Sequence, residues 1–296
     1  MSKKNIVCFG EVLWDLLPSG KIAGGAPMNV AVHATQLGLN ATMISAVGND
    51  DLGDGIKSFL ESRQLSIENI QTLNDKQTGI VEVVLNEKGS PTYTIIEPVA
   101  WDFIGLTDSA EKKVIEADAL VFGSLALRNE ISKNTILALQ AKAKLRILDI
   151  NLRKPFYSAE LAKELFEIAD LVKVNDEELE MICAWYGQSG DELSNAKFLK
   201  NLFKLQGIIV TRGGNGAFFV DKNNEMAEHQ GFKVEVNDTI GSGDSFLASF
   251  ITKWLNGFSA SKALEFACAV GAYVATQKGA TPIINEADIL EMIEKG

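Results

Sequence analysis

Short apolar runs alternate with amphipathic stretches along most of the chain. The apolar runs are four to seven residues long and rich in β-branched side chains, so they predict buried strands at 6–10, 41–47, 119–123, 146–150, 171–174 and 207–211. Helical periodicity predicts helices at 27–37, 54–64, 130–143, 158–169, 176–185 and 192–203. Strands without internal polar alternation, separated by helices, favour an α/β fold with a mostly parallel sheet covered on both faces.

Two segments depart from this alternation. Residues 12–23 follow the first expected strand directly and carry a turn at Pro18-Ser19-Gly20. Residues 80–85 and 91–96 flank Asn86-Glu87-Lys88-Gly89, in which Asn and Gly suit a hairpin reversal. We expect a small β flap built from about 12–23 and 80–100 and projecting from the edge of the main sheet. Two ordinary surface hairpins are the alternative.

Composition narrows the class of protein. The chain has 296 residues, 46% of them hydrophobic and 23% charged, as expected of a globular protein with a large core. We expect one domain over 1–296, since no linker or repeat divides it. The net charge of −11 argues against nucleic acid or an anionic membrane as a partner. Three dispersed cysteines and the lack of a long apolar run predict a cytoplasmic protein.

The strongest chemical pattern lies at 238–244. Gly241, Ser242 and Gly243 follow a β-rich stretch, 232–236, and precede a long apolar helix, 246–255. Small residues at a helix entrance let backbone amides converge on an anion, and the helix dipole adds positive potential. Asp244 then lies beside that anion site, where a carboxylate can accept a hydroxyl proton. A plain helix cap after a tight turn is the alternative.

A second pattern begins after the first expected strand. Gly24 and Gly25 allow close approach of a ligand, and Asn29 offers both donors and acceptors near a helix start. Asp15 lies upstream, near the carboxyl end of the first strand, where the ligand crevice of a parallel sheet opens. Short acidic and amide side chains of this kind bind sugar hydroxyls, although Asp15 alone could be a solvated turn residue.

A third pattern, 211–216, is a glycine-rich loop that follows a strand. It is typical of a nucleotide cradle and also of any tight hairpin. The ordinary P-loop and the six-position dinucleotide fingerprint are both absent from the sequence, and two isolated histidines make neither a metal site nor a hydrolase triad.

In order and spacing, these patterns resemble the ribokinase, or PfkB-type, family of sugar kinases. Its first signature is matched by 24–31 running on to 37–38 and 47–53, and its second by 238–244. Intermediate blocks at 123–124, 149–153, 175–178 and 211–216 also match. The resemblance covers nearly the whole chain and implies a three-layer α/β/α sandwich with a mostly parallel central sheet and a small β lid over the sugar.

The resemblance also implies roles for individual residues. Asp244 is the expected base, Gly241, Ser242 and Gly243 the anion hole, and Asp15, Gly24, Gly25 and Asn29 the sugar site. Asn175 and Glu178 match an Asn-x-x-Glu motif that organises Mg²⁺ through water, and Thr211, Gly214 and Gly216 match the ATP site. Arg153 either faces the phosphates or forms a structural ion pair. Asp238 and the Ile240 carbonyl match a monovalent-cation site, typically of potassium. In several members the lids pack together in a homodimer.

Within that family the chain looks most like the fructokinases, because the block at 10–15, Gly-Glu-Val-Leu-Trp-Asp, occurs together with Gly-Gly-Ala-Pro-x-Asn at 24–29. The expected reaction is transfer from MgATP to the primary hydroxyl of a neutral hexose, with D-fructose giving fructose 6-phosphate. Two alternatives remain: a kinase of the same family for 2-keto-3-deoxygluconate or ribose, and a non-catalytic sugar sensor on a kinase fold.

Overall fold

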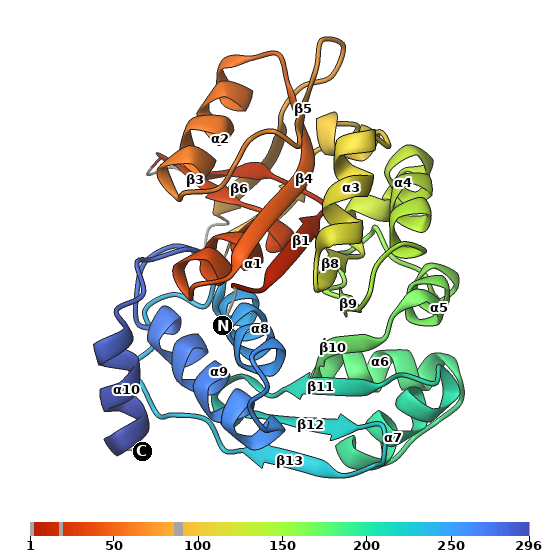
Figure 1. The fold of residues 1–296 in the computed structure, drawn as a ribbon, viewed down its shortest axis with the longest axis vertical. Coiled ribbons are helices and arrows are strands. Elements are labelled where there is room, and N and C mark those ends of the chain that lie inside the picture. Colours follow the sequence, from red (N-terminus) through yellow and green to blue (C-terminus); the bar gives the residue numbers. More distant parts are fainter. Residues whose placement is uncertain (1–2, 18–19, 86–90, 296) are drawn as a thin grey trace.

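The computed structural model describes residues 3–17, 20–85 and 91–295 (Figure 1). The strands are β1 (Asn5–Phe9), β2 (Leu13–Leu17), β3 (Gly20–Gly24), β4 (Asn40–Gly48), β5 (Ile70–Leu73), β6 (Gly79–Leu85), β7 (Pro91–Ile95), β8 (Ala119–Gly123), β9 (Arg146–Asp149), β10 (Leu171–Asn175), β11 (Gly207–Thr211), β12 (Ala217–Asp221) and β13 (Met226–His229). The helices are α1 (Ala26–Gln36), α2 (Asp51–Ser62), α3 (Asp108–Glu116), α4 (Glu130–Gln140), α5 (Ala159–Ile168), α6 (Asp176–Trp185), α7 (Glu192–Leu202), α8 (Ser242–Leu255), α9 (Ala260–Ala275) and α10 (Glu286–Lys295).

The larger sheet has nine strands within the described residues. Their order is β13-β12-β11-β10-β9-β8-β1-β4-β5. The pairs from β11 through β10, β9, β8, β1 and β4 to β5 are parallel, whereas β12 and β13 add an antiparallel edge. This arrangement confirms the expected α/β fold with a mostly parallel sheet.

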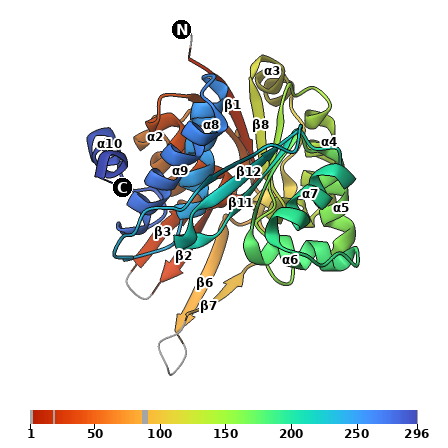
Figure 2. The same ribbon diagram turned by 90° about the horizontal axis from the view of Figure 1, so that it is seen from below.

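Helices cover both faces of this sheet (Figures 1 and 2). Successive residues of β1 point to opposite faces, as the two-residue strand period requires. Val7 and Phe9 pack in a core with residues of α3 to α7, whereas Ile6 and Cys8 pack with residues of α1, α2, α8 and α9. Because both faces of the sheet are buried, the sequence of β1 is a nearly continuous apolar run.

A second, smaller sheet has the strand order β3-β2-β6-β7 among the described residues, and Figure 2 shows it projecting from the main body. β2 pairs with β6 in parallel, so the segments expected to form the flap share one sheet. The turns predicted at Pro18-Ser19 and at Asn86-Glu87-Lys88-Gly89 lie outside the described residues.

The β-rich stretch at 232–236 does not form a strand. Residues 232–236 belong to no sheet and run as an extended segment. Phe232, Val234 and Val236 alternate with polar residues because these three line a cavity, not because the segment pairs with a neighbouring strand. Separately, no helix of the described chain combines the length and apolarity needed to cross a bilayer.

Candidate active site

The candidate site lies at the carboxyl edge of the parallel strands. Glu11 follows β1, Asp149 ends β9, Asn175 ends β10 and Thr211 ends β11. Strands that run in the same direction bring these four positions to one edge of the sheet, which is where open α/β sheets bind ligands.

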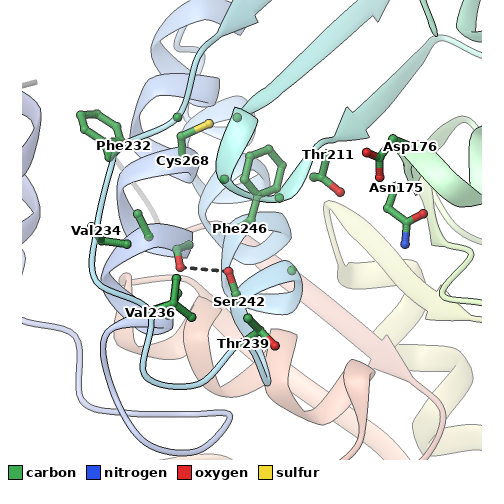
Figure 3. Close-up of a pocket in the computed structure, with 18 of the residues that line it drawn as sticks. Asn175, Asp176, Thr211, Phe232, Val234, Val236, Thr239, Ser242, Phe246 and Cys268 are labelled. Atoms are coloured by element: carbon green, nitrogen blue, oxygen red, sulfur yellow. Dashed lines mark hydrogen bonds between the residues drawn. The ribbon is translucent and has the colours of Figure 1, made fainter.

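The first turn of α8 provides the expected anion site. Gly241 caps the helix in a left-handed conformation, with φ of 77°, and a Cβ atom there would overlap the Ala280 carbonyl oxygen. A side chain at this position is therefore excluded both by the backbone angle and by the neighbouring chain. Ser242 is fixed by a 2.9 Å hydrogen bond from its Oγ to the Gly271 carbonyl, drawn in Figure 3. The Ser242 amide donates to the Thr239 carbonyl at 3.3 Å, whereas the Gly243 amide makes no such bond among the described residues. That free amide and the helix dipole favour an anion.

Asp244 lies in the same turn and is half-buried. Asn29 Nδ2, in the first turns of α1, donates to Asp244 Oδ2 over 2.8 Å. Burial raises the pKa of Asp244 to about 6, and the Asp149 charge adds to this rise, whereas Asn29, Lys173 and Arg153 oppose it. A carboxylate with that pKa is mostly ionised at neutral pH and is basic enough to accept a proton.

The start of α1 forms the expected sugar end of the site. Gly25 has φ of 118°, and a Cβ atom there would overlap the Glu11 carbonyl oxygen. A Cβ on Gly24 would lie 2.6 Å from Asp15 Oδ2, so the Asp15 carboxylate lies directly against this glycine. Burial raises the pKa of Asp15 to about 6. The two glycines thus let the chain pass close to two acidic residues, Glu11 and Asp15.

Glu11 is a further acidic group here to which the sequence analysis assigned no role. Its side chain is buried, and Oε2 has no hydrogen-bond partner among the described residues. Burial, together with the charge of Asp244, raises the pKa of Glu11 to about 7, although backbone amides of Glu11 and Ala26 and the charge of Arg153 oppose this rise. Glu11 and Asp244 are therefore electrostatically coupled.

A cavity of about 420 Å³ opens beside the turn (Figure 3). Six residues predicted from the sequence line it: Asn175, Thr211, Gly214, Gly216, Ser242 and Gly243. The cavity also has an apolar wall, which no sequence pattern predicts; it consists of Phe232, Val234, Val236, Phe246, Cys268, Ala272 and Ala275. In Figure 3, Val234 and Val236 lie on the side opposite Asn175 and Asp176. An apolar wall facing polar backbone and amide groups suits a flat heterocycle joined to phosphates.

Beneath the anion site lies a buried ion pair. Lys173 Nζ donates to Asp149 Oδ1 at 2.8 Å and to Oδ2 at 3.0 Å, and both side chains are buried. Lys173 Nζ also lies 3.6 Å from the position that a Cβ on Gly243 would occupy. Although burial acts to lower it, the pKa of Lys173 is raised by the charges of Asp149, Glu178 and Asp244. A lysine within an apolar strand was the signal for this pair in the sequence.

The Asn175–Glu178 pair forms a capping box at the start of α6. Asn175 Oδ1 accepts from the Glu178 amide at 2.7 Å, and Glu178 Oε2 accepts from the Asn175 amide at 2.9 Å. Glu178 Oε1 accepts from the Leu152 amide at 2.8 Å. No cluster of three or more metal-ligating His, Cys, Asp or Glu side chains occurs in the part of the chain that the structure describes. These oxygens are held by backbone, so they fit a magnesium ion bound through water rather than directly.

The remaining expected site residues lie around this centre. Asp238 Oδ1 accepts from the Ile240 amide at 3.0 Å and Oδ2 accepts from the Gly279 amide at 3.1 Å, so Asp238 ties two loops together. Arg153 is exposed, and its charge lowers the pKa of Glu11, Asp15 and Asp244. Among the described residues Arg153 makes no ion pair, which leaves its guanidinium available to an anion.

Residues 4–287 match the sequence profile of the pfkB family carbohydrate kinase. The chain belongs to this family of carbohydrate kinases. Fructokinase-2 of Solanum lycopersicum is 31% identical over 321 residues, which cover 98% of this chain and 96% of the relative. Probable fructokinase-6 of Arabidopsis thaliana, described as chloroplastic, is 29% identical over 94% of this chain and 79% of the relative.

Solved structures confirm the expected ribokinase-like arrangement of this pfkB kinase. The fructokinase of Vibrio cholerae O395 in its fructose, ADP and calcium ion bound form has a TM-score of 0.84 at 26% identity, covering 99% of this chain and 100% of that one. The ATP-bound fructokinase of Xylella fastidiosa has a TM-score of 0.85 at 23% identity and covers 99% of each chain, which supports the fold alone.

Proposed function

We propose that this chain transfers the γ-phosphoryl group of MgATP to the C6 primary hydroxyl of D-fructose and releases fructose 6-phosphate and ADP. The observation that carries this proposal is the position of Asp244. Its neighbour Gly243 lines the 420 Å³ cavity, and its own carboxylate is hydrogen-bonded to Asn29 at the sugar end. A base at the junction between a nucleotide cavity and a sugar site suits in-line transfer.

Asp244 accepts the proton of the attacking hydroxyl as the oxygen forms its bond to phosphorus. The bond from the γ-phosphorus to the bridging oxygen breaks, and ADP keeps that electron pair. Amides of the turn formed by Gly241, Ser242 and Gly243 stabilise the charge on the transferring group. Thr211, Gly214 and Gly216 line the nucleotide cavity, and Arg153 presents its guanidinium to the phosphates. Magnesium, oriented by Asn175 and Glu178 through water, would neutralise phosphate charge.

The sugar end favours a neutral substrate. Asp15, Gly25 and Asn29 offer a carboxylate, backbone and an amide, the groups that bind hydroxyls. Lys21 is the one cation in the sequence between 12 and 23, and its Nζ lies 4.5 Å from the ring centroid of Trp14. That lysine is therefore engaged with an aromatic ring rather than free to hold a second phosphate. Relatives named fructokinase support fructose as the sugar.

The position of the new phosphate tests this proposal. The protein is incubated with MgATP and D-fructose, and the product is assigned by phosphorus–proton coupling in NMR. Fructose carries primary hydroxyls on C1 and on C6, and coupling to the C6 protons is expected because the proposed product is fructose 6-phosphate. Phosphate on C1 would overturn the assignment of the hydroxyl. Sugar binding without any ADP release would instead favour a sensor.

Three further properties belong to the same proposal. The β3-β2-β6-β7 sheet acts as a lid, and its edge strands β3 and β7 offer unpaired backbone to a second copy in a homodimer.

A potassium ion binds near Asp238 and the Ile240 carbonyl, next to the loop that Asp238 already ties to Gly279. The protein works in the cytoplasm, in keeping with its three free cysteines, all buried.

A further inference from the structure

Helix α1 carries three polar side chains along one side. Asn29, His33 and Gln36 are spaced by four and three residues, so they lie above one another on one helix face. Asn29 binds Asp244, as described above. The other two residues bind the segment that follows α9, which lies behind the anion site.

His33 is completely buried. Its Nε2 lies 2.9 Å from the Ala280 carbonyl oxygen, which can only accept a hydrogen bond, so Nε2 carries the proton and donates. Burial lowers the pKa of His33 to about 4, and the ring is therefore neutral at physiological pH. Its Nδ1 has no partner among the described residues. Among the described residues, the bond to the Ala280 carbonyl is therefore the only hydrogen bond that fixes the His33 ring.

The carbonyl that His33 binds packs directly against the anion site. A Cβ atom on Gly241 would overlap both the oxygen and the Cα of Ala280. One residue before Ala280, the Gly279 amide donates to Asp238 Oδ2 over 3.1 Å. The segment at 279–280 thus contacts the turn at Asp238 and at Gly241, and it supports the N-terminus of α8 from behind.

Gln36 holds the same segment further along. Its Nε2 donates to the Pro282 carbonyl at 3.2 Å, and its Oε1 accepts from the Ile284 amide at 2.9 Å. Gln36 therefore fixes the end of the segment, whereas His33 fixes the part that touches Gly241.

We propose that His33 is a positioning residue for phosphoryl transfer: it holds the Ala280 carbonyl against Gly241 and thereby fixes the amides of the anion site relative to Asp244. The proposal rests on the function proposed above. Helix α1 binds the base through Asn29 and the support of the anion site through His33, so one rigid helix sets the distance between the two. Such alignment contributes to the rate of a transfer reaction far more than to the binding of its substrates.

Three variants of the full chain test this role. H33L introduces an apolar side chain of similar size and removes the donor, whereas H33Q replaces the ring N–H with an amide donor that can reach the Ala280 carbonyl. T35V is the matched control, because the Thr35 hydroxyl bonds the Ala31 carbonyl within α1 and does not contact the 279–284 segment. For each variant we would measure kcat, KM for fructose, and inhibition by ADP alone and by ADP with aluminium fluoride, which mimics the transferring phosphoryl group.

We expect H33L to lower kcat by about 10-fold to 100-fold with little change in KM or in ADP affinity. Inhibition of H33L by ADP with aluminium fluoride should weaken by a similar factor. H33Q should recover most of the lost kcat, and T35V should have the kcat of the wild type. A purely structural role would lower thermal stability but leave the folded variant with full turnover, and that result would overturn the proposal. If H33L does not fold, H33N, whose amide is too short to reach Ala280, gives the same comparison with H33Q.

The wild-type assay separates this proposal from the one on which it rests. A wild type that phosphorylates no sugar would contradict the proposed function and this inference together. An active wild type with an equally active H33L or H33N would contradict the inference alone.

Discussion

Asn29 Nδ2 and Asp244 Oδ2 are joined by a 2.8 Å hydrogen bond across 215 residues of sequence. The bond connects the first turns of α1, at the proposed sugar end, with the first turn of α8, at the proposed anion site. An amide that donates to the base leaves its own oxygen free, and Asn29 Oδ1 indeed has no partner among the described residues. This oxygen is buried, and a sugar hydroxyl that reached it would lie next to the group that we propose accepts its proton.

The first prediction concerns the base. D244N keeps the shape of the side chain but removes its ability to accept a proton, so kcat should fall by about 10²-fold to 10⁴-fold. ADP affinity, measured by calorimetry, should change little because Asp244 does not line the nucleotide cavity. D108N makes the same substitution in the first turn of α3, away from the site, and should have wild-type turnover. Unchanged kcat in D244N would show that Asp244 is not the base.

The second prediction is that kcat/KM falls at acidic pH, below a limit set by the pKa of Asp244. Asp244 must be ionised to accept the proton, and its pKa is about 6, so kcat/KM should fall towards tenfold per pH unit as the pH drops below about 6. N29D would place a second carboxylate against Asp244 and should move this limit to higher pH, since like charges raise the pKa. A pH profile of both proteins checks this. A limit that moves in E11Q but not in N29D would assign it to Glu11 instead.

The third prediction concerns stability at Glu11. The pKa of Glu11 is raised from 4.5 to about 7, so the folded state binds this proton more tightly than the unfolded chain does. The contribution of Glu11 to stability is therefore greatest below pH 4.5 and is lost as the pH rises towards 7. E11Q removes the buried charge and should increase the free energy of unfolding by about 1–3 kcal/mol at pH 8, with little change at pH 4. Urea unfolding at the two pH values tests this, and destabilisation at pH 8 would contradict it.

The fourth prediction concerns the buried ion pair. K173M leaves the Asp149 carboxylate buried without its partner, so unfolding should become easier by about 3–5 kcal/mol. K173M should also lower turnover, because it removes the ammonium group beside Gly243. The double variant D149L/K173M should recover much of the lost stability, but its turnover should stay low because the ammonium group is still absent. K133M is the control: it breaks an ion pair with the half-exposed Glu164 and should cost at most about 1 kcal/mol. Full activity of the folded double variant would show that Lys173 has no role in the reaction.

The parts of the site that lie close together in the sequence could be predicted from it. Gly241 and Asp244 are three residues apart, and both belong to the start of α8, which fixes their arrangement. The local sequence was therefore sufficient to predict that they lie together. Lys173 was missed because its partner, Asp149, belongs to another strand and becomes a neighbour only when the sheet forms. His33 looks isolated in the sequence for the same reason, since Ala280, whose carbonyl it binds, lies 247 residues further along the chain.

The alternation of apolar and polar residues at 232–236 is misleading as evidence for a strand, because it has another cause. The apolar positions of 232–236 have the period of a strand, but they face a cavity rather than a sheet. Cavity-lining segments and edge strands share this two-residue period, so periodicity alone does not distinguish them. Helices α9 and α10 had no counterpart among the expected elements. Helix α9 is apolar on nearly all sides because it packs against α8 and also against α10, so its periodicity is weak.

ADP release from MgATP, measured over a panel of sugars, tests the central claim most directly. The panel contains D-fructose, glucose, mannose, ribose, 2-keto-3-deoxygluconate and fructose 6-phosphate. We expect strong turnover with fructose, which D244N abolishes, and little with the other sugars. Turnover with a different sugar would keep Asp244 as the base but contradict fructose as the substrate, and bound sugar with no ADP release from any member of the panel would contradict the kinase reaction itself.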